Sequence, residues 1–306
     1  MEDYEVVRRL GSGAQGTTYQ VRRKIDGRSL VVKQLMCDGI GPANNALHEA
    51  KTLQVGLPPA QFPASARATF KPTLTHPLFG SQKLGAHRGV VKYEDVFLHE
   101  ERVAGVPRLV VGIVMELCAR GDLAGVIAER RKASNSPLGE ATIARWLKEI
   151  CAALGVCHAA KILHRDALNI LLTEEGELKL ADFGLARDLS GTVQSRVGTP
   201  AYLAPEVLQN EIYGAPADLW GVGCIGFEAM SRDFLWERKG LLSIQVLSVA
   251  VNPKTLPGGY TLELRSLVAA LLDKDPARRP TAASAETHLA TLERNAPRVA
   301  HRQLGE

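Results

Sequence analysis

The chain has 306 residues, 45% hydrophobic and 23% charged, a composition typical of a soluble globular protein with one large or two medium domains. Its formal net charge of +4 is mild, and the dense basic stripe of a nucleic-acid-binding protein is absent. The amino terminus lacks a signal-peptide pattern, and no apolar run is long enough to span a membrane. Five cysteines show no metal-binding or secreted spacing. These features predict a cytoplasmic protein with no nucleic-acid or membrane partner.

The first third of the chain has the pattern of β-strands. Alternating and β-branched residues predict strands at 4–10, 17–24 and 29–36, with a turn at Asp26-Gly27 between the last two. Two further strands are predicted at 90–98 and 108–116, joined by a loop that contains Gly105 and Pro107. The residues before position 117 therefore predict a β-rich half.

Helical patterns dominate the rest of the chain. Apolar spacing predicts helices at 45–53, 123–131 and 140–158, and more follow toward the carboxyl end. Strands first and helices afterwards indicate an α+β fold whose halves connect near residues 117–121. Residues 56–86 contain five prolines and no sustained periodicity, so we expect a surface excursion or a disordered insertion there.

A glycine cluster, Gly11-Ser12-Gly13-Ala14-Gln15-Gly16, separates the first two predicted strands. Its GxGxxG pattern alone is weak evidence, because a plain turn or a dinucleotide-binding fold also explains it. A dinucleotide-binding fold requires a helix directly after the glycines, whereas the residues after Gly16 have a strand pattern. Glycines at this place allow the backbone to fold over phosphate groups and to offer them its N–H groups.

Further motifs follow the glycine cluster in a fixed order. Lys33 ends the β-branched run Leu30-Val31-Val32, and Glu49 lies on the predicted helix, where it is able to pair with Lys33. The later motifs are His164-Arg165-Asp166, Asn169, Asp182-Phe183-Gly184, Ala204-Pro205-Glu206 and Asp218-Leu219-Trp220. Each tripeptide is common by chance, but the ordered set matches the protein-kinase signature.

The sequence resembles the eukaryotic protein kinase superfamily over residues 4–292, and it is most similar to the NIMA-related serine/threonine kinases. The phrases VMELCARGDL, NILLTEEGELKLADFGLA, GTPAYLAPEVL and YTLELRSLVAALLDKDPARRPT carry this likeness. The resemblance implies a bilobal kinase fold. A small β-rich lobe at about 4–116 would hold the insertion, and a larger helical lobe at about 121–292 would precede a short tail, 293–306. It also implies transfer of the ATP γ-phosphoryl group to protein Ser or Thr hydroxyls, with Mg²⁺.

The resemblance also assigns candidate site residues. Lys33, held by Glu49, would contact the α- and β-phosphates; Asp166 would position the acceptor hydroxyl; and Asn169 and Asp182 would hold Mg²⁺. The expected nucleotide-contacting positions are Leu10, Gly11, Ser12, Gly13, Ala14, Gly16, Thr18, Val31, Glu116, Cys118, Asp122 and Leu171. Asp122 fits ribose binding and a helix N-cap equally well. Thr18 stands where valine is usual, which makes the expected adenine lid smaller and more polar.

The segment between Asp182 and Glu206 offers candidate phosphorylation sites. Ser195 lies where the family commonly carries its activating hydroxyl, Thr192 is the second candidate, and Thr199 is expected beside the catalytic aspartate. We expect Glu206 to pair with Arg279 and brace this segment. Trp220 is expected in the core.

The catalytic loop departs from the family pattern. The kinase loop has four residues between its aspartate and asparagine, whereas only Ala167 and Leu168 separate Asp166 from Asn169. The lysine that normally follows the aspartate is also missing. Two residues span roughly 7 Å of extended chain. Three explanations stay open: an error in the coding sequence, a tolerated deletion with reduced phosphotransfer, or a pseudokinase that binds ATP or only protein partners.

Overall fold

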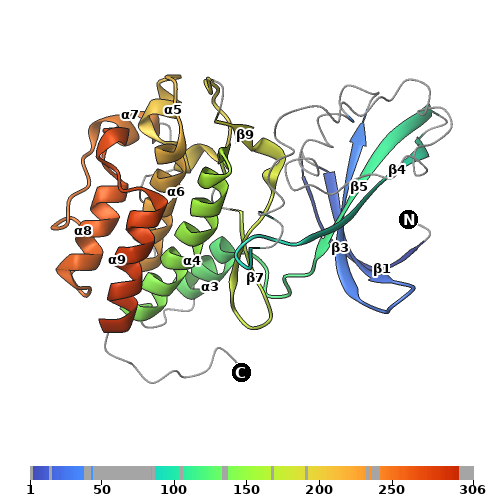
Figure 1. The fold of residues 1–306 in the computed structure, drawn as a ribbon, viewed down its shortest axis with the longest axis horizontal. Helices are drawn as coiled ribbons and strands as arrows, with labels where there is room; N and C mark the ends of the chain where they lie inside the picture. Colours follow the sequence, from blue (N-terminus) through green and yellow to red (C-terminus); the bar gives the residue numbers. More distant parts are fainter. Residues whose placement is uncertain are drawn as a thin grey trace. The chain divides into compact units, whose positions relative to one another are not determined.

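The computed structural model describes residues 3–13, 16–37, 43, 84, 87–103, 106–132, 137–166, 169–189, 192–231, 235 and 242–295. The chain forms two compact units (Figure 1). Unit 1 contains Met1–Ala119 together with Asp182–Gly184, and unit 2 contains Arg120–Ala181 and Leu185–Glu306. Among the sequence predictions, Ala14, Glu49, the helix at 45–53, nearly all of the insertion and the end of the tail lie outside the described residues.

A five-stranded antiparallel sheet forms unit 1, with strand order β1-β2-β3-β5-β4 (Figure 1). The strands are β1 (Tyr4–Gly13), β2 (Gly16–Arg23), β3 (Ser29–Cys37), β4 (Tyr93–Val103) and β5 (Val106–Glu116). The five predicted strands are therefore confirmed. The turn at Asp26-Gly27 is also present: Asp26 accepts a hydrogen bond from the Arg28 N–H at 3.1 Å, and Gly27 has a φ of +71°.

The sheet buries a cluster of β-branched and aromatic side chains on one face. Its buried members are Tyr4, Val21, Leu30, Val32, Phe97 and Val114. The rings of Tyr4 and Phe97 stack with centroids 6.1 Å apart. A Cβ at Gly112 would lie 2.2 Å from the Phe97 ring, so the glycine allows this ring to pack flat on β5. The period-2 pattern thus fixes which face of each strand is buried.

The last hairpin differs from the prediction. β4 and β5 reach Val103 and Val106, which pair directly, so the predicted loop between 98 and 108 is almost entirely strand. Charged residues at 100–102 hide the strand pattern, because these positions are exposed. Pro107 is the second residue of β5, close to the first position of a strand, where proline is tolerated.

Helices make up most of unit 2. They are α3 (Leu123–Lys132), α4 (Glu140–Ala159), α5 (Pro205–Leu208), α6 (Ala215–Ser231), α7 (Leu242–Ser248), α8 (Leu262–Leu271) and α9 (Ala282–Asn295). Two-stranded sheets join β6 (Ile162–Leu163) to β9 (Arg187–Asp188), and β7 (Ile170–Leu172) to β8 (Leu178–Leu180). The predicted helices at 123–131 and 140–158 are confirmed to within one residue at each end.

α6 lies at the centre of unit 2 and contacts α4 and α8, whereas α9 packs along α4 (Figure 1). α6 is buried almost all round, and Trp220 is fully buried, as the sequence predicts. Within the described part of the chain, no helix is both long enough and apolar enough to cross a membrane. This buried helix supports the loop around Asp166.

Candidate functional site

The glycine cluster lies where β1 turns into β2. Gly13 and Gly16 face each other in the register, and Ala14 and Gln15 between them lie outside the described residues. Gly16 has a φ of +117°, and a Cβ there would lie 2.1 Å from the Gln34 carbonyl oxygen. Only glycine fits this position. Leu10, which is 41% exposed, precedes the cluster on β1.

Lys33 and Asp182 form an ion pair within unit 1. The Lys33 Nζ lies 2.8 Å from Asp182 Oδ1, and the two side chains are 12% and 24% exposed. Asp182 has a φ of +59° and also accepts a hydrogen bond from the Gly184 N–H at 3.3 Å. Phe183 between them is fully buried. The structure thus joins a cation and a carboxylate that are 149 residues apart in sequence.

The expected adenine-contacting positions lie on neighbouring strands. Val31 on β3 is opposite Met115 on β5, and both side chains are buried. Thr18 on β2 is opposite Lys33. Glu116 exchanges two hydrogen bonds with Lys92: its N–H donates to the Lys92 carbonyl at 2.9 Å, and its Oε1 accepts from the Lys92 N–H at 2.6 Å.

These two bonds fix the end of β5. Cys118 follows it and is half-buried, so its backbone lies just beyond this anchored point.

Asp122 caps α3. Its Oδ1 accepts a hydrogen bond from the Gly125 N–H at 2.6 Å, and its carbonyl accepts one from the Val126 N–H at 3.2 Å. Asp122 also forms a β-bridge with Leu171, so two predicted nucleotide-contacting positions are neighbours in unit 2. The geometry is that of a helix N-cap, one of the two roles open from the sequence. Ribose binding by Asp122 stays a prediction.

The loop around Asp166 is held from below by a buried carboxylate, Asp218 on α6. Its Oδ2 accepts a hydrogen bond from the His164 N–H at 3.0 Å, and its Oδ1 accepts one from the Arg165 N–H at 2.8 Å. His158 Nε2 lies 2.8 Å from Oδ2. Burial raises the pKa of Asp218, but the contact with His158 and these backbone donors outweigh it, so the pKa lies below its ordinary value.

Asp218 therefore stays ionised. It sets the backbone of the residues directly before Asp166, including Arg165 with its φ of +70°.

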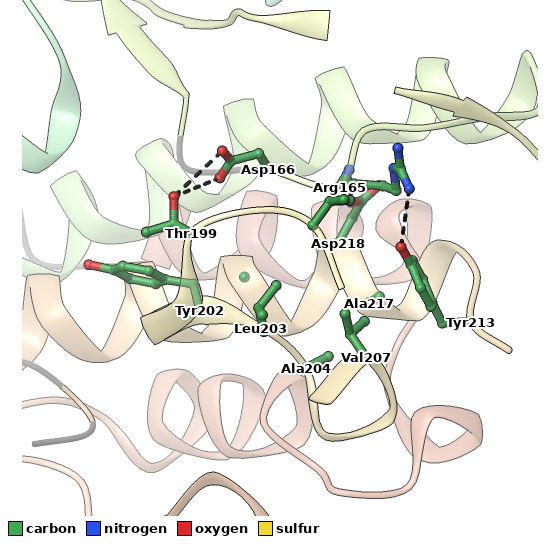
Figure 2. A pocket seen from close by; sticks show the side chains of 12 residues that line it. Arg165, Asp166, Thr199, Tyr202, Leu203, Ala204, Val207, Tyr213, Ala217 and Asp218 are labelled. Carbon is green, nitrogen blue, oxygen red and sulfur yellow. Dashed lines mark hydrogen bonds between the residues drawn. The ribbon is translucent and has the colours of Figure 1, made fainter. Parts of the chain in front are cut away.

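Thr199 contacts Asp166. Its Oγ1 donates to Asp166 Oδ1 at 3.2 Å, as Figure 2 shows, so the hydroxyl lies where the resemblance implies. Gly198 allows this approach: it has a φ of +109°, and a Cβ there would lie 2.6 Å from the Arg165 carbonyl oxygen. A larger residue at 198 would push the segment away from the loop.

A backbone hydrogen bond spans the shortened loop. The Asn169 N–H donates to the Asp166 carbonyl at 3.1 Å, an i to i+3 bond. The Asn169 carbonyl in turn accepts a hydrogen bond from the Ala181 N–H at 2.7 Å. Ala167 and Leu168 lie outside the described residues. Asp166 and Asn169 are therefore tied together through their backbones across the deletion.

Arg165 connects this loop to Ser195. Its NH1 donates to Ser195 Oγ at 2.7 Å and lies 3.4 Å from the Tyr213 hydroxyl, while its Nε donates to the Leu185 carbonyl at 2.5 Å. The Tyr213 hydroxyl donates to the Ser195 carbonyl at 2.8 Å. A guanidinium group thus already faces the first candidate phosphorylation site. Thr192 is exposed.

A small cavity of about 30 Å³ lies between this segment and α6, and Asp166 and Asp218 form part of its wall (Figure 2). The other lining residues are Arg165, Val197, Thr199, Tyr202, Leu203, Ala204, Val207, Tyr213, Ala217 and Gly221. Apolar side chains from 203–207 line one side of it and the two carboxylates the other. The cavity belongs to the same site as Asp166.

Glu206 and Arg279 form the buried ion pair predicted from the sequence. Arg279 NH1 and NH2 lie 2.6 and 2.8 Å from the two carboxylate oxygens of Glu206. The guanidinium also donates to the carbonyls of Pro216 at 2.9 Å and Asp273 at 2.8 Å, and it lies 5.1 Å from the Trp220 ring centroid. This bidentate pair ties the end of the segment to α6 and to the loop before α9.

Sequence reasoning missed two supports of the site. Asp218 was recognised as part of a motif, but its bonds to the backbone of His164 and Arg165 were not expected, and neither was the contact with His158. His158 lies at the end of a helical pattern, and a half-buried histidine at such a position gives no sign of a polar contact. The role of Tyr213 beside Ser195 has no sequence signal either, because it depends on a contact between loops.

Residues 80–289 match the family model of the protein kinase domain. The chain belongs to the protein kinase domain family. Its five-stranded sheet and helical unit are the two parts of the α+β, bilobal fold of that family. The matched region begins after β3, so the glycine cluster and Lys33 precede it.

The chain is also similar to curated Nek proteins. It is 30% identical to serine/threonine-protein kinase Nek6 of Oryza sativa subsp. japonica, over 94% of this chain and 48% of the relative. It is 29% identical to serine/threonine-protein kinase Nek1 of Mus musculus, over 92% and 21%, and 30% identical to probable serine/threonine-protein kinase nek2 of Dictyostelium discoideum, over 92% and 60%. The chain thus spans between about a fifth and three fifths of the length of these relatives.

Proposed function

We propose that this kinase domain is an ATP-dependent serine/threonine kinase that transfers the γ-phosphoryl group to hydroxyls of protein substrates. The contact of Lys33 with Asp182 carries the proposal, because it brings a phosphate-binding cation and a hard metal-binding oxygen within 2.8 Å. Similarity to proteins named serine/threonine kinases supports the choice of acceptor. Free thiols at all five cysteines agree with a cytoplasmic location.

The candidate residues divide the work between binding and positioning. Lys33, supported by Glu49, would hold the α- and β-phosphates beneath the turn at Gly13 and Gly16. Asp166 would orient the acceptor hydroxyl and take its proton, with Thr199 fixing the carboxylate. The backbone of Glu116 and Cys118 would bind adenine, which Leu10, Gly11, Ser12, Ala14, Thr18, Val31 and Leu171 would enclose, with Asp122 near the ribose.

The donor set suits Mg²⁺. This ion prefers hard oxygen ligands, and one or two protein side chains suffice when phosphate oxygens complete its shell. Asp182 keeps its carboxylate 24% exposed, and Asn169 supplies an amide oxygen as the second candidate ligand. When bound, the ion would neutralise charge on the transferring group.

A nucleotide-binding pseudokinase is the second candidate function. One observation favours it: the backbone bond between Asp166 and Asn169, which restrains both residues across the shortened loop. In this case, Lys33 and the backbone of Glu116 and Cys118 would still bind ATP, but Asp166 and Asn169 would not act on the same phosphoryl group. Loss of transfer with retained binding distinguishes the two functions.

Substitution of Lys33 tests the proposed function. We expect the purified chain to transfer labelled phosphate to casein or myelin basic protein. Lys33→Met should lower the rate by about 10²-fold or more, because the ammonium group positioned to bind phosphate is lost. ATP binding should weaken while the far-UV circular dichroism spectrum stays unchanged. Lys24→Met, an exposed lysine at the end of β2, is the matched control and should keep the activity.

The possible outcomes separate the alternatives. Transfer that is unaffected by Lys33→Met and by Asp182→Ala would reject this site as the source of activity. ATP binding with no transfer by the native chain would establish the pseudokinase.

Phosphorylation of Ser195 should raise the activity. A phosphate adds close to two negative charges and would meet the Arg165 guanidinium, whose NH1 already lies 2.7 Å from Ser195 Oγ. We expect Ser195→Ala to lower the activity about tenfold, the effect of one lost charge-assisted contact. Mass spectrometry after incubation with Mg-ATP should find the modified residue.

Thr192→Ala is the control for Ser195, because Thr192 is exposed and no hydrogen bond of its side chain is seen in the described part of the segment. Full activity in Ser195→Ala together with a loss in Thr192→Ala would move the switch to Thr192.

A further inference from the structure

The β2–β3 turn of unit 1 concentrates positive charge. Residues 22–28 contain four Lys or Arg and one Asp, a formal charge of +3. Arg22, Arg23 and Lys24 come together at the end of β2, and Arg28 lies directly before β3. None of these residues belongs to the proposed catalytic machinery.

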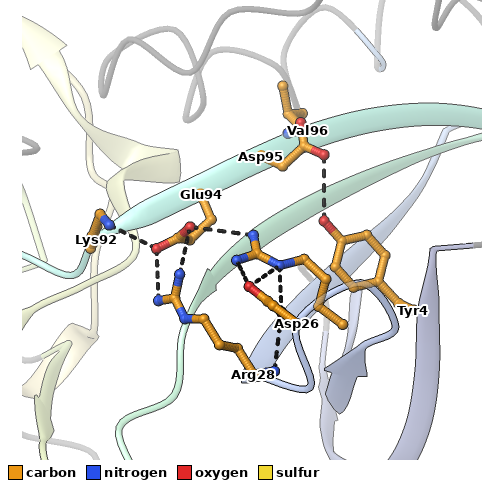
Figure 3. Close-up of polar contacts among 8 residues, drawn as sticks. Tyr4, Asp26, Arg28, Lys92, Glu94, Asp95 and Val96 are labelled. Atoms are coloured by element: carbon orange, nitrogen blue, oxygen red, sulfur yellow. Dashed lines mark hydrogen bonds and ion pairs between the residues drawn. The ribbon is translucent and has the colours of Figure 1, made fainter.

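Three cationic side chains lie around the carboxylate of Glu94 on β4, beside this turn. It lies 3.0 Å from Arg28 NH2, 3.5 Å from Arg23 NH1 and 2.9 Å from Lys92 Nζ, and Figure 3 shows the group. Hydrogen bonds from Lys92 and Arg28 hold the pKa of Glu94 below its ordinary value, so the carboxylate stays charged. Asp26 pairs with Arg23. The cationic side chains around Glu94 and Asp26 therefore outnumber these two acids.

The cations stay accessible. The side chains of Arg28 and Lys92 are 47% and 57% exposed although they pair with Glu94. Arg22 and Lys24 are exposed, and neither forms an ion pair with any residue that the structure describes. Ile25 at the tip of the turn is 90% exposed, the highest value among the exposed large hydrophobic residues of the described chain. The surface thus combines an excess of positive charge with one apolar contact point.

We propose that this basic turn surface, formed by Arg22, Lys24, Ile25, Arg28 and Lys92, binds an acidic, extended segment of a partner protein. Carboxylates of the segment would pair with the guanidinium and ammonium groups, and an apolar side chain would cover Ile25. Arginine favours such an interface, because its planar guanidinium binds a carboxylate in a bidentate manner and loses little hydration. The binding does not depend on phosphoryl transfer.

The same surface fits a membrane or a nucleic acid less well. Asp26 is 34% exposed within it, and Glu5 lies opposite Arg22 in the strand register. A continuous sheet or ladder of phosphates would come close to these carboxylates. A peptide is able to place its acidic side chains around them. Five cations against the three acids Asp26, Glu94 and Glu5 leave two net charges, which give little affinity for an anionic bilayer, about 1 kcal/mol each near the surface.

Binding of a synthetic acidic peptide tests the proposal. The probe is a fluorescein-labelled peptide of about ten residues, roughly 33 Å when extended, with alternating Glu residues and a central Leu. Fluorescence anisotropy with the full chain should show saturable binding that weakens between about 0.05 M and 0.3 M salt. Arg22→Glu with Lys24→Glu should weaken binding about tenfold, and Arg22→Gln with Lys24→Gln should weaken it less. Ile25→Ser should weaken binding to the Leu peptide but not to an all-Glu peptide.

Lys132→Glu with Lys254→Glu is the matched control, because it makes the same change in net charge at exposed lysines of unit 2. Equal weakening by this control would reduce the effect to overall charge and overturn the proposal. Tighter binding to vesicles containing phosphatidylserine, or to a DNA duplex, than to the peptide would overturn it as well. Melting temperatures of all variants should stay within a few degrees of the native chain, since every substituted residue is exposed.

Discussion

Replacing Arg279 with methionine should destabilise the protein by about 3–5 kcal/mol, because it leaves the Glu206 carboxylate buried without its partner. The side chains of Arg279 and Glu206 are 0% and 3% exposed, so water is not able to replace the lost bonds. Two backbone carbonyls, of Pro216 and Asp273, lose their donors at the same time. In a thermal melt, the midpoint should fall by on the order of 10 °C.

The neighbouring residue supplies the control. Arg278 is 74% exposed and lies 3.5 Å from Asp275, which is 51% exposed, so Arg278→Met should change stability by less than about 0.5 kcal/mol. The double variant Glu206→Gln with Arg279→Met removes both charges and should recover part of the loss. Equal melting temperatures for Arg278→Met and Arg279→Met would show that the pair does not hold this segment.

The sequence predicts elements well where burial leaves a simple pattern. β3 contains the consecutive buried residues Leu30, Val31 and Val32, and α4 repeats its apolar residues at helical spacing, so both are found close to their true bounds. The outer half of the β4–β5 hairpin was missed because Glu100 and Glu101 are exposed on both faces and leave no alternation. Length of a strand beyond the core is set by its partner strand rather than by its own side chains.

Prediction of the site follows a similar division. The ordered motifs led to Lys33, Asp166 and Asp182, and the pairing of Glu206 with Arg279 was found in advance. Contacts that hold these residues were not predicted, because they join a side chain to a distant backbone, as Asp218 does with Arg165. Every residue except proline has a backbone N–H, so no sequence pattern predicts which side chain accepts a hydrogen bond from it.

Lengthening the shortened loop should raise kcat. We expect at least about a tenfold increase when Asp166-Ala167-Leu168-Asn169 becomes Asp-Ala-Lys-Leu-Gly-Asn, since a positioned acid or base is worth about 10²–10⁴-fold and the repair is partial. In the native loop the Asn169 N–H donates to the Asp166 carbonyl, so the backbones of the two residues are tied together. Two more residues break this i to i+3 relation and free both side chains to face the same phosphoryl group.

Three comparisons make this experiment decisive. Insertion of Asp-Ala-Gly-Leu-Gly-Asn restores the length without the lysine, so the difference between the two insertions measures the cation alone. The same insertion in an Asp182→Ala background should be inactive, because the expected Mg²⁺ ligand is gone. ATP affinity should change much less than kcat, since Lys33, the glycine turn and the strand end at Glu116 are untouched. An unchanged kcat in a natively active chain would mean that the backbone bond between Asp166 and Asn169 belongs to the working geometry.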